Sequence, residues 1–112
     1  MGNTMKNMQQ MSFMIILYAG NARSASMEAI AFAKRFDFQA ARDKIEEAEK
    51  AFTSAHKEQT NLLQQEASGE KYEVSIILVH AQDHLMTAMT VKDLANEMID
   101  MYEKIKEMGE HH

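Results

Sequence analysis

The segment from His80 to Thr87 places side chains capable of chemistry inside an otherwise apolar stretch. It reads His-Ala-Gln-Asp-His-Leu-Met-Thr and follows the largely apolar run 74–79. In a helix, residues at offsets of 3, 4 and 7 share one face. This rule groups His80, Asp83, His84 and Thr87, and it turns Gln82 toward the flank. Polar groups in an apolar wall cost free energy unless they are paired, so the cluster is either a satisfied buried network or a functional site.

One role for this cluster is metal binding. His80 and His84 have the i, i+4 spacing that can hold a divalent cation, with Asp83 helping, in the manner of a zinc hydrolase. A third protein ligand would then come from His56 or from another subunit. The pattern His-x-x-Asp-His is not one of the specific zinc-protease signatures.

Two further roles fit the same residues. A neutral imidazole that is half-exposed at a groove accepts and donates a phosphoryl group well, and Gln82 and Thr87 could donate hydrogen bonds to the phosphoryl oxygens. The third role is purely structural, a buried polar network that sets the register of an oligomer interface. Composition and spacing do not choose among the three.

The other candidate reactive residues carry weaker signals. Ser24 and Ser26 lie outside any Gly-x-Ser-x-Gly elbow, and nothing supplies a strand–turn–helix context for a nucleophilic serine. His56 falls on a polar side of its helix and is expected at the surface. His111 and His112 follow a glycine at the chain end, where a solvated tail or an expression remnant explains them.

Composition excludes several classes of protein. The 112 residues make one domain, and the absence of cysteine excludes a disulfide scaffold, a thiol nucleophile and any Cys-ligated metal. With 12 basic against 17 acidic residues, the net charge of −5 argues against nucleic-acid binding. The longest apolar stretch, 11–19, is too short to span a bilayer, and we find no signal peptide. We therefore expect a cytoplasmic protein without membrane insertion.

Three long helices must position the cluster. The chain has no proline, and apolar residues recur at spacings of 3 and 4, which is typical of helices and not of strands. The first apolar stripe runs from Met11 to Phe36 and stays in register past Gly20, which predicts one helix, either straight or kinked near Gly20. The pattern predicts a second helix that begins at Phe38 with Asp37 as its cap, and a third from about Lys71 to Met108. At 1.5 Å per residue the third helix would be roughly 55 Å long. The expected fold is all-α, with three antiparallel helices in a coiled-coil-like bundle.

The third helix is apolar around more of its circumference than packing against two neighbours requires. We therefore expect a homo-oligomer whose central seam is this helix. The alternative is that the chain's 11 methionines fill an irregular monomer core. We expect a single domain over residues 1–112, with frayed ends at 1–10 and 109–112.

A family resemblance lies in three stretches of the chain. The segment 74–87, with its His-Ala-Gln-Asp-His run, strongly resembles the phosphorylation-site helix of the lactose/cellobiose-type enzyme IIA subunits of the bacterial phosphoenolpyruvate-dependent sugar phosphotransferase system. Gly20-Asn21-Ala22-Arg23-Ser24 and the stretch 55–60, Ala-His-Lys-Glu-Gln-Thr, resemble the same family. The resemblance runs from about Ser12 to Lys106 in order, and departures are confined to the ends.

The resemblance implies a phosphocarrier. The subunit would trimerise into a nine-helix bundle, and His80 would accept a phosphoryl group from the histidine of the carrier protein HPr and pass it to the cysteine of an enzyme IIB. Gln82 and His84 match supporting neighbours of the active histidine. Asp83 matches the aspartate that gathers around the trimer axis and can bind a divalent cation such as magnesium. No organic cofactor is implied, and neither Arg23 nor His56 receives a role.

Sugar choice lies in the membrane-embedded IIC subunit of such systems, an indirect partner. The resemblance therefore limits the sugar to a β-linked disaccharide or oligosaccharide, with a preference for cellobiose-like β-glucosides. Two alternatives follow from the residues alone. One is a divalent-metal-dependent hydrolase that uses His80, His84 and Asp83, and the other is a non-catalytic oligomeric bundle.

Overall fold

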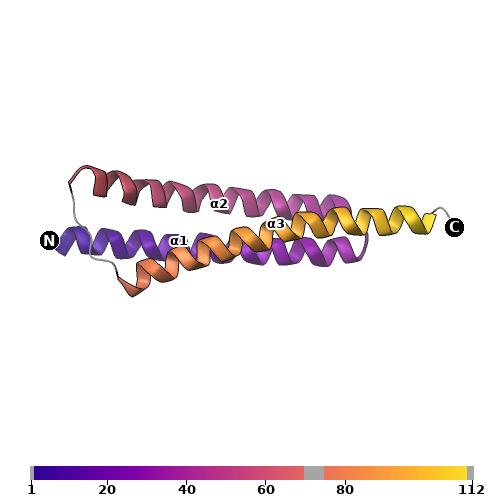
Figure 1. Ribbon diagram of the computed structural model, residues 1–112, viewed down its shortest axis with the longest axis horizontal. Helices are drawn as coiled ribbons and strands as arrows, with labels where there is room; N and C mark the ends of the chain where they lie inside the picture. Colours follow the sequence, from indigo (N-terminus) through magenta and orange to yellow (C-terminus); the bar gives the residue numbers. More distant parts are fainter. Residues whose placement is uncertain (1, 70–74, 111–112) are drawn as a thin grey trace.

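The computed structural model describes residues 2–69 and 75–110, and these form three helices (Figure 1). Helix α1 spans Gly2–Lys34, α2 spans Phe38–Ala67 and α3 spans Ile76–Glu110. They lie alongside one another in a rod of 67 × 19 × 18 Å, and the described residues contain no strand. The all-α prediction is confirmed, and α1 runs through Gly20 as a single helix.

The turn between α1 and α2 is built from the hydrogen bonds that end one helix and begin the next. The amide of Asp37 donates to the carbonyl of Phe32, and the amide of Phe36 donates to that of Ala33, which together make a Schellman closure of α1. Phe36 takes the left-handed conformation that this closure requires, with φ of 61°. The Asp37 side chain then accepts from the amide of Ala40, so the predicted cap of α2 is confirmed.

Helix α3 begins at Ile76, later than the predicted start near Lys71. The Ser75 hydroxyl accepts a hydrogen bond from the amide of Leu78 at 3.2 Å, which is the geometry of a helix N-cap. Residues 70–74 lie outside the described part of the chain. The apolar pattern continues through the cap, because Val74 precedes it, and spacing alone therefore placed the start too early.

The core lies mainly on α1, which packs against both other helices. Apart from Met8 and Ile15, its inward face is made of small side chains, and these let the neighbouring helices approach closely. That face contains Ser12, Ala19, Ala22, Ala25, Ser26, Ala29 and Ala33. Phe52 and Leu85 supply larger side chains to the same core from α2 and α3. Helices α2 and α3 touch each other less, so α1 is the common support of the bundle.

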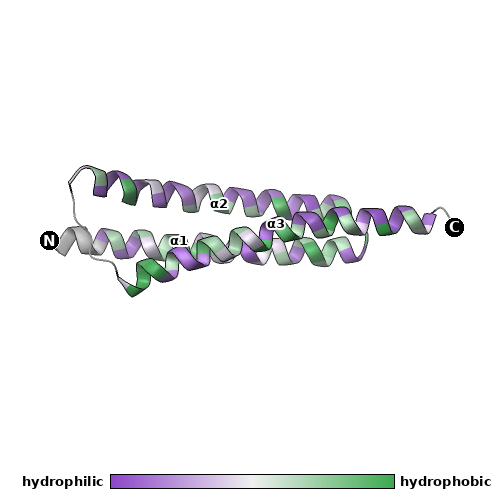
Figure 2. Ribbon diagram, in the orientation of Figure 1, coloured by the Kyte–Doolittle hydropathy of each residue, from purple (hydrophilic) through white to green (hydrophobic). Residues whose placement is uncertain are grey.

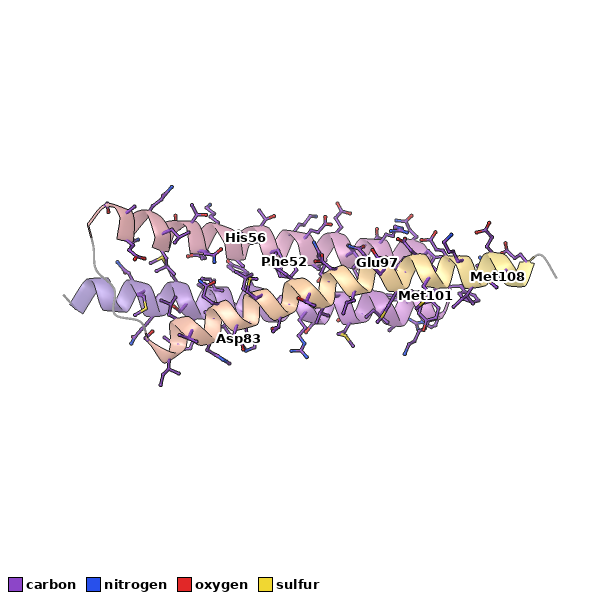
Figure 3. The ribbon with its side chains drawn as sticks, in the orientation of Figure 1. Phe52, His56, Asp83, Glu97, Met101 and Met108 are labelled. Carbon is purple, nitrogen blue, oxygen red and sulfur yellow. The ribbon has the colours of Figure 1, made fainter. Side chains whose placement is uncertain are left out.

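One face of α3 is apolar and uncovered, and we call it the open face. Its large apolar side chains are Ile76, Val79, Met86, Leu94, Met101 and Met108, each more than half exposed. Figure 2 shows the hydrophobic start of α3, and Figure 3 labels Met101 and Met108 farther along the helix. Methionines therefore occupy both places, because Met86, Met101 and Met108 are exposed here while Met8 is buried in the core and Met11 and Met89 pack against it. The predicted oligomer stays a prediction.

Helix extends into both ends where fraying was expected. Residues 2–10 belong to α1, and Met8 is only 2% exposed because it packs into the core. Residues 109 and 110 belong to α3, whereas residue 1 and the two terminal histidines lie outside the described part of the chain. Among the described residues, none of the helices combines the length and hydrophobicity needed to cross a membrane.

Candidate functional site

His80 and His84 lie one turn apart near the start of α3, and their rings meet. The two Nε2 atoms are 3.1 Å apart, the ring centroids are 4.4 Å apart, and the rings stand edge to face at 88°. His80 is exposed and His84 is half-buried. The prediction from spacing that these two imidazoles share one face of a helix is therefore confirmed.

His80 borders an open hollow at the beginning of α3. The hollow has a volume of about 500 Å³ and is lined by Ser75, Ile76, Val79, His80 and Asp83. Ile76 and Val79 give it apolar walls, whereas the His80 imidazole and the Asp83 carboxylate are its titratable groups. A chemical group that enters this hollow meets the His80 ring against an apolar surround.

Gln82 points to the other side of α3 and reaches α2. The Nε2 of Gln59 donates to the Oε1 of Gln82 at 2.8 Å, in a partly buried position. Gln82 was predicted on the flank, and the structure confirms it. Gln59 was not predicted as a site residue, although it falls on the apolar stripe of α2 two positions after a lysine and four after Ala55. A polar side chain on a buried stripe was the available signal.

Asp83 and Thr87 do not join the histidine pair. The Thr87 hydroxyl donates to the backbone carbonyl of Asp83 at 2.9 Å and also lies 3.3 Å from the carbonyl of His84. That hydroxyl is therefore engaged within its own helix, which corrects the idea that it is free to donate to a bound group. Asp83 is exposed and lies on the margin of α3 turned away from α2 (Figure 3).

The histidine pair lacks further protein ligands within the described chain. Over residues 2–69 and 75–110, no group of three or more histidine, aspartate or glutamate side chains is placed to hold a metal ion. The predicted trio of His80, His84 and Asp83 therefore does not assemble within one subunit. His56 does not complete it either, since it is exposed on α2.

Comparison with known proteins identifies the family. The profile of the "PTS system, Lactose/Cellobiose specific IIA subunit" matches residues 10–103, which is most of the chain. The chain belongs to this family. It is therefore an enzyme IIA component of a sugar phosphotransferase system, as the resemblance of the His80 segment implied.

Relatives of this IIA protein align with it over nearly its whole length. The lichenan-specific phosphotransferase enzyme IIA component of Bacillus subtilis is 55% identical over 102 residues, covering 91% of this chain and 93% of the relative. The crystal structure of the cellobiose-specific enzyme IIA from Bacillus anthracis superposes with a TM-score of 0.84 at 52% identity, covering 87% and 89% of the two chains. The three-helix subunit is thus the fold of this family.

A third relative was solved together with a partner. The solution structure of the chitobiose IIA–HPr complex of the Escherichia coli phosphotransferase system matches with a TM-score of 0.76 at 37% identity, covering 88% of this chain and 96% of that one. Its partner, HPr, is the carrier protein expected from the sequence of this IIA protein.

The remaining candidate residues of this IIA protein stand apart from the histidine pair. Ser26 is fully buried, and its hydroxyl donates to the carbonyl of Ala22 at 2.8 Å, so it is a helix-packing residue. Ser24 is exposed and lines a second groove, between α1 and α2, of about 430 Å³. Arg23 is exposed on α1.

Proposed function

We propose that this protein is a phosphocarrier in which His80 accepts a phosphoryl group from phospho-HPr and passes it to the cysteine of an enzyme IIB. The observation that carries the proposal is the placement of His80, an exposed imidazole at the rim of an apolar hollow, within the segment that matches the family. In the first step a bond forms between a His80 nitrogen and phosphorus as the bond from phosphorus to the HPr histidine breaks. In the second step a sulfur–phosphorus bond replaces the bond to His80.

Phosphoryl transfer through a loose transition state needs in-line placement and stabilisation of charge on the equatorial oxygens. His84 is suited to this supporting role because its Nε2 lies 3.1 Å from that of His80 and carries a proton in one tautomer. Gln82 is a second supporting residue. It lies on the α2 side of α3, where its carbonyl oxygen accepts from Gln59, so in this proposal it supports the position of the helix that carries His80.

The surface around His80 suits transient protein partners. Ile76 is 90% exposed and Val79 is more than half exposed, so they form an apolar rim on which a donor and an acceptor protein can dock in turn. The HPr complex of the chitobiose relative supports this use of the fold. A phosphocarrier handles a protein-bound phosphoryl group and needs no sugar pocket.

Assembly into a homotrimer with α3 at its centre would cover the open face. This face leaves at least six large apolar side chains exposed in one subunit, which is a common mark of an interaction surface. In such a trimer the three copies of Asp83 would approach the axis. Three carboxylates brought together and desolvated need a counter-charge.

A divalent cation such as Mg²⁺ fits the Asp83 carboxylate, because hard cations take oxygen ligands. The Asp83 carboxylate has no hydrogen-bond or ion-pair partner within the described part of the chain, so it is available to such an ion. When bound, the cation would neutralise the gathered carboxylates and stabilise the assembly.

The transported sugar belongs, in our proposal, to the β-linked disaccharides and oligosaccharides. Relatives that are 55% and 52% identical to this chain are named for lichenan and cellobiose, and these support a β-glucoside. The membrane subunit IIC of the same system would make that choice.

The proposal is tested by incubating the protein with phosphoenolpyruvate, enzyme I and HPr, followed by mass spectrometry under non-acidic conditions. We expect one acid-labile phosphoryl group, located on His80. His80→Ala should abolish labelling with unchanged helix content, whereas His56→Ala, which removes an exposed imidazole from α2, should be labelled normally. Labelling at another residue, or none with active enzyme I and HPr, would overturn the proposal in favour of a metal site or a non-catalytic bundle.

A further inference from the structure

The two histidines have a nitrogen–nitrogen separation close to that of a metal chelate. Both Nε2 atoms face one another at 3.1 Å across one turn of α3. Zinc binds imidazole nitrogen at about 2.0–2.1 Å, so two such bonds at a tetrahedral angle hold their nitrogens about 3.3 Å apart. The observed separation differs from that value by about 0.2 Å, a change that small ring rotations accommodate.

We propose that His80 and His84 together chelate a first-row transition cation, Zn²⁺ in particular, through their Nε2 atoms. Imidazole ligands suit Zn²⁺, Cu²⁺ and Ni²⁺, whereas Mg²⁺ prefers oxygen. This site is therefore chemically different from a carboxylate site at Asp83. Water fills the other coordination positions, because the described part of the chain supplies no third side chain. A site with two protein ligands binds reversibly.

Access and charge favour the cation. His80 is exposed at the rim of the hollow, so a hydrated ion reaches its ring from solvent. Asp83 lines the same hollow, and the chain carries a net charge of −5. The Asp83 carboxylate and the negative net charge both raise the concentration of cations near His80.

The chelate has a regulatory consequence, which rests on the proposed function of His80. A metal ion on Nε2 uses the lone pair that would attack phosphorus, and it also holds the His84 ring that would support the phosphoryl group. Bound zinc and phosphoryl transfer through this nitrogen therefore exclude one another. The site would make the carrier sensitive to free transition-metal ions.

Binding is measured first, by competing the full chain against a chromophoric zinc chelator. The His111→Ala/His112→Ala variant serves as the parent for all others, because the terminal imidazoles also bind metals. We expect one Zn²⁺ per chain. His80→Ala or His84→Ala should weaken binding by about tenfold or more, since the second ligand of a chelate adds at high effective concentration. Alanine favours helix, so both variants should keep the circular dichroism of the parent.

Two matched variants locate the ion. His56→Ala removes a lone imidazole and should leave the affinity unchanged, and Asp83→Asn should reduce it far less than His84→Ala does. Unchanged affinity in His84→Ala, or one Zn²⁺ per three chains that is lost in Asp83→Asn, would overturn the chelate.

Inhibition is then measured in a single turnover from purified phospho-HPr with one equivalent of Zn²⁺. The initial rate should fall in proportion to the zinc-bound fraction of chains and return when the metal is removed by a chelator. Unchanged transfer on zinc-loaded protein would overturn the regulatory consequence and leave the phosphocarrier proposal standing. Absence of transfer in metal-free protein would instead contradict the phosphocarrier proposal and leave the binding result standing.

Discussion

Polar side chains near the start of α3 engage partners on both sides of the helix. His80 and His84 pair with each other on one side, while Gln82 pairs with Gln59 of α2 on the other. The Gln59–Gln82 bond is a partly buried link between helices that otherwise touch little. It ties the position of α3 near the site to α2.

At the residue scale, we expect Gln59→Leu to lower the free energy of unfolding by about 1–2 kcal/mol, because it leaves the carbonyl of Gln82 without its donor in a partly buried place. Urea denaturation followed by circular dichroism measures the change. Gln39→Leu is the matched control. It removes an exposed bond from Gln39 to Asp43 on the same helix and should change stability by less than about 0.5 kcal/mol. Equal effects of the two substitutions would contradict this account.

The elements are held together by a narrow core that small residues of α1 dominate. Phe52 is the largest buried side chain that α2 contributes, and it is 5% exposed. The ammonium group of Lys92 on α3 lies 5.7 Å from its ring centroid, so Phe52 also meets α3 through a cation–π contact.

At the element scale, Phe52→Ala should destabilise the bundle by about 3–5 kcal/mol, since it leaves a cavity in the core between long helices. Thermal and urea unfolding measure the loss. Thr53→Ala, next along the helix, replaces an exposed side chain whose hydroxyl donates to the carbonyl of Glu49. It should have little effect, and a comparable loss there would rule out the cavity explanation.

Lys44 links α1 to α2 electrostatically. Its ammonium group lies 2.7 Å from a carboxylate oxygen of Glu28 and 3.1 Å from one of Glu47. The hydrogen bond to Glu28 and then that to Glu47 raise the pKa of Lys44 above its ordinary value of 10.5. A raised pKa in the folded state means that this contribution to stability is complete below 10.5 and is lost as pH rises through the higher folded pKa.

Stability between pH 9 and pH 12 tests this link. The free energy of unfolding should fall more steeply with rising pH in the parent protein than in Lys44→Met, because only the parent has this ammonium group to lose. Parallel curves for the two proteins would show that Lys44 does not couple protonation to folding. Other lysines and tyrosines titrate in both proteins, so the difference between the curves is the informative quantity.

At the scale of the whole molecule, the open face of α3 is an apolar surface that α1 and α2 leave exposed. A single subunit buries alanines of all three helices and leaves Met86, Met101 and Met108 of α3 exposed, although Met8 of α1 lies in the core. Met86 lies on this face and is 60% exposed, the same as Leu63 on α2. If α3 forms the centre of a trimer, the Met86 side chain would be covered and the Leu63 side chain would stay exposed.

Met86→Glu should therefore reduce the mass in sedimentation from trimer toward monomer at micromolar concentration, because it buries like charges at the seam. Leu63→Glu puts the same charge on α2 and should leave the mass of the parent unchanged. A parent protein that sediments as a monomer would refute the trimer directly. Loss of assembly in Leu63→Glu alone would place the seam on α2.

Local sequence signals account for the helices and for the meeting of His80 with His84. The spacings of 3 and 4, the absence of proline and the cap at Asp37 act over one or two turns, so they are readable from the chain itself. Spacing did not reveal the start of α3 at Ile76, because Val74 and Ile76 are apolar on either side of Ser75 and a capping hydroxyl gives no break in periodicity. The family resemblance was likewise local, carried by the residues around His80, and the match over residues 10–103 confirmed it.

The sequence by itself determined the helical class, the shared face of the two histidines and the surplus of apolar side chains on the last helix. Only the tertiary structure decided which partners these residues meet. It paired Gln59 with Gln82 across two helices, kept Asp83 and Thr87 out of the histidine pair, and left Met86, Met101 and Met108 outside the core. The physical reason is that periodicity assigns a residue to a face of its helix, whereas the packing of three helices decides which faces are covered.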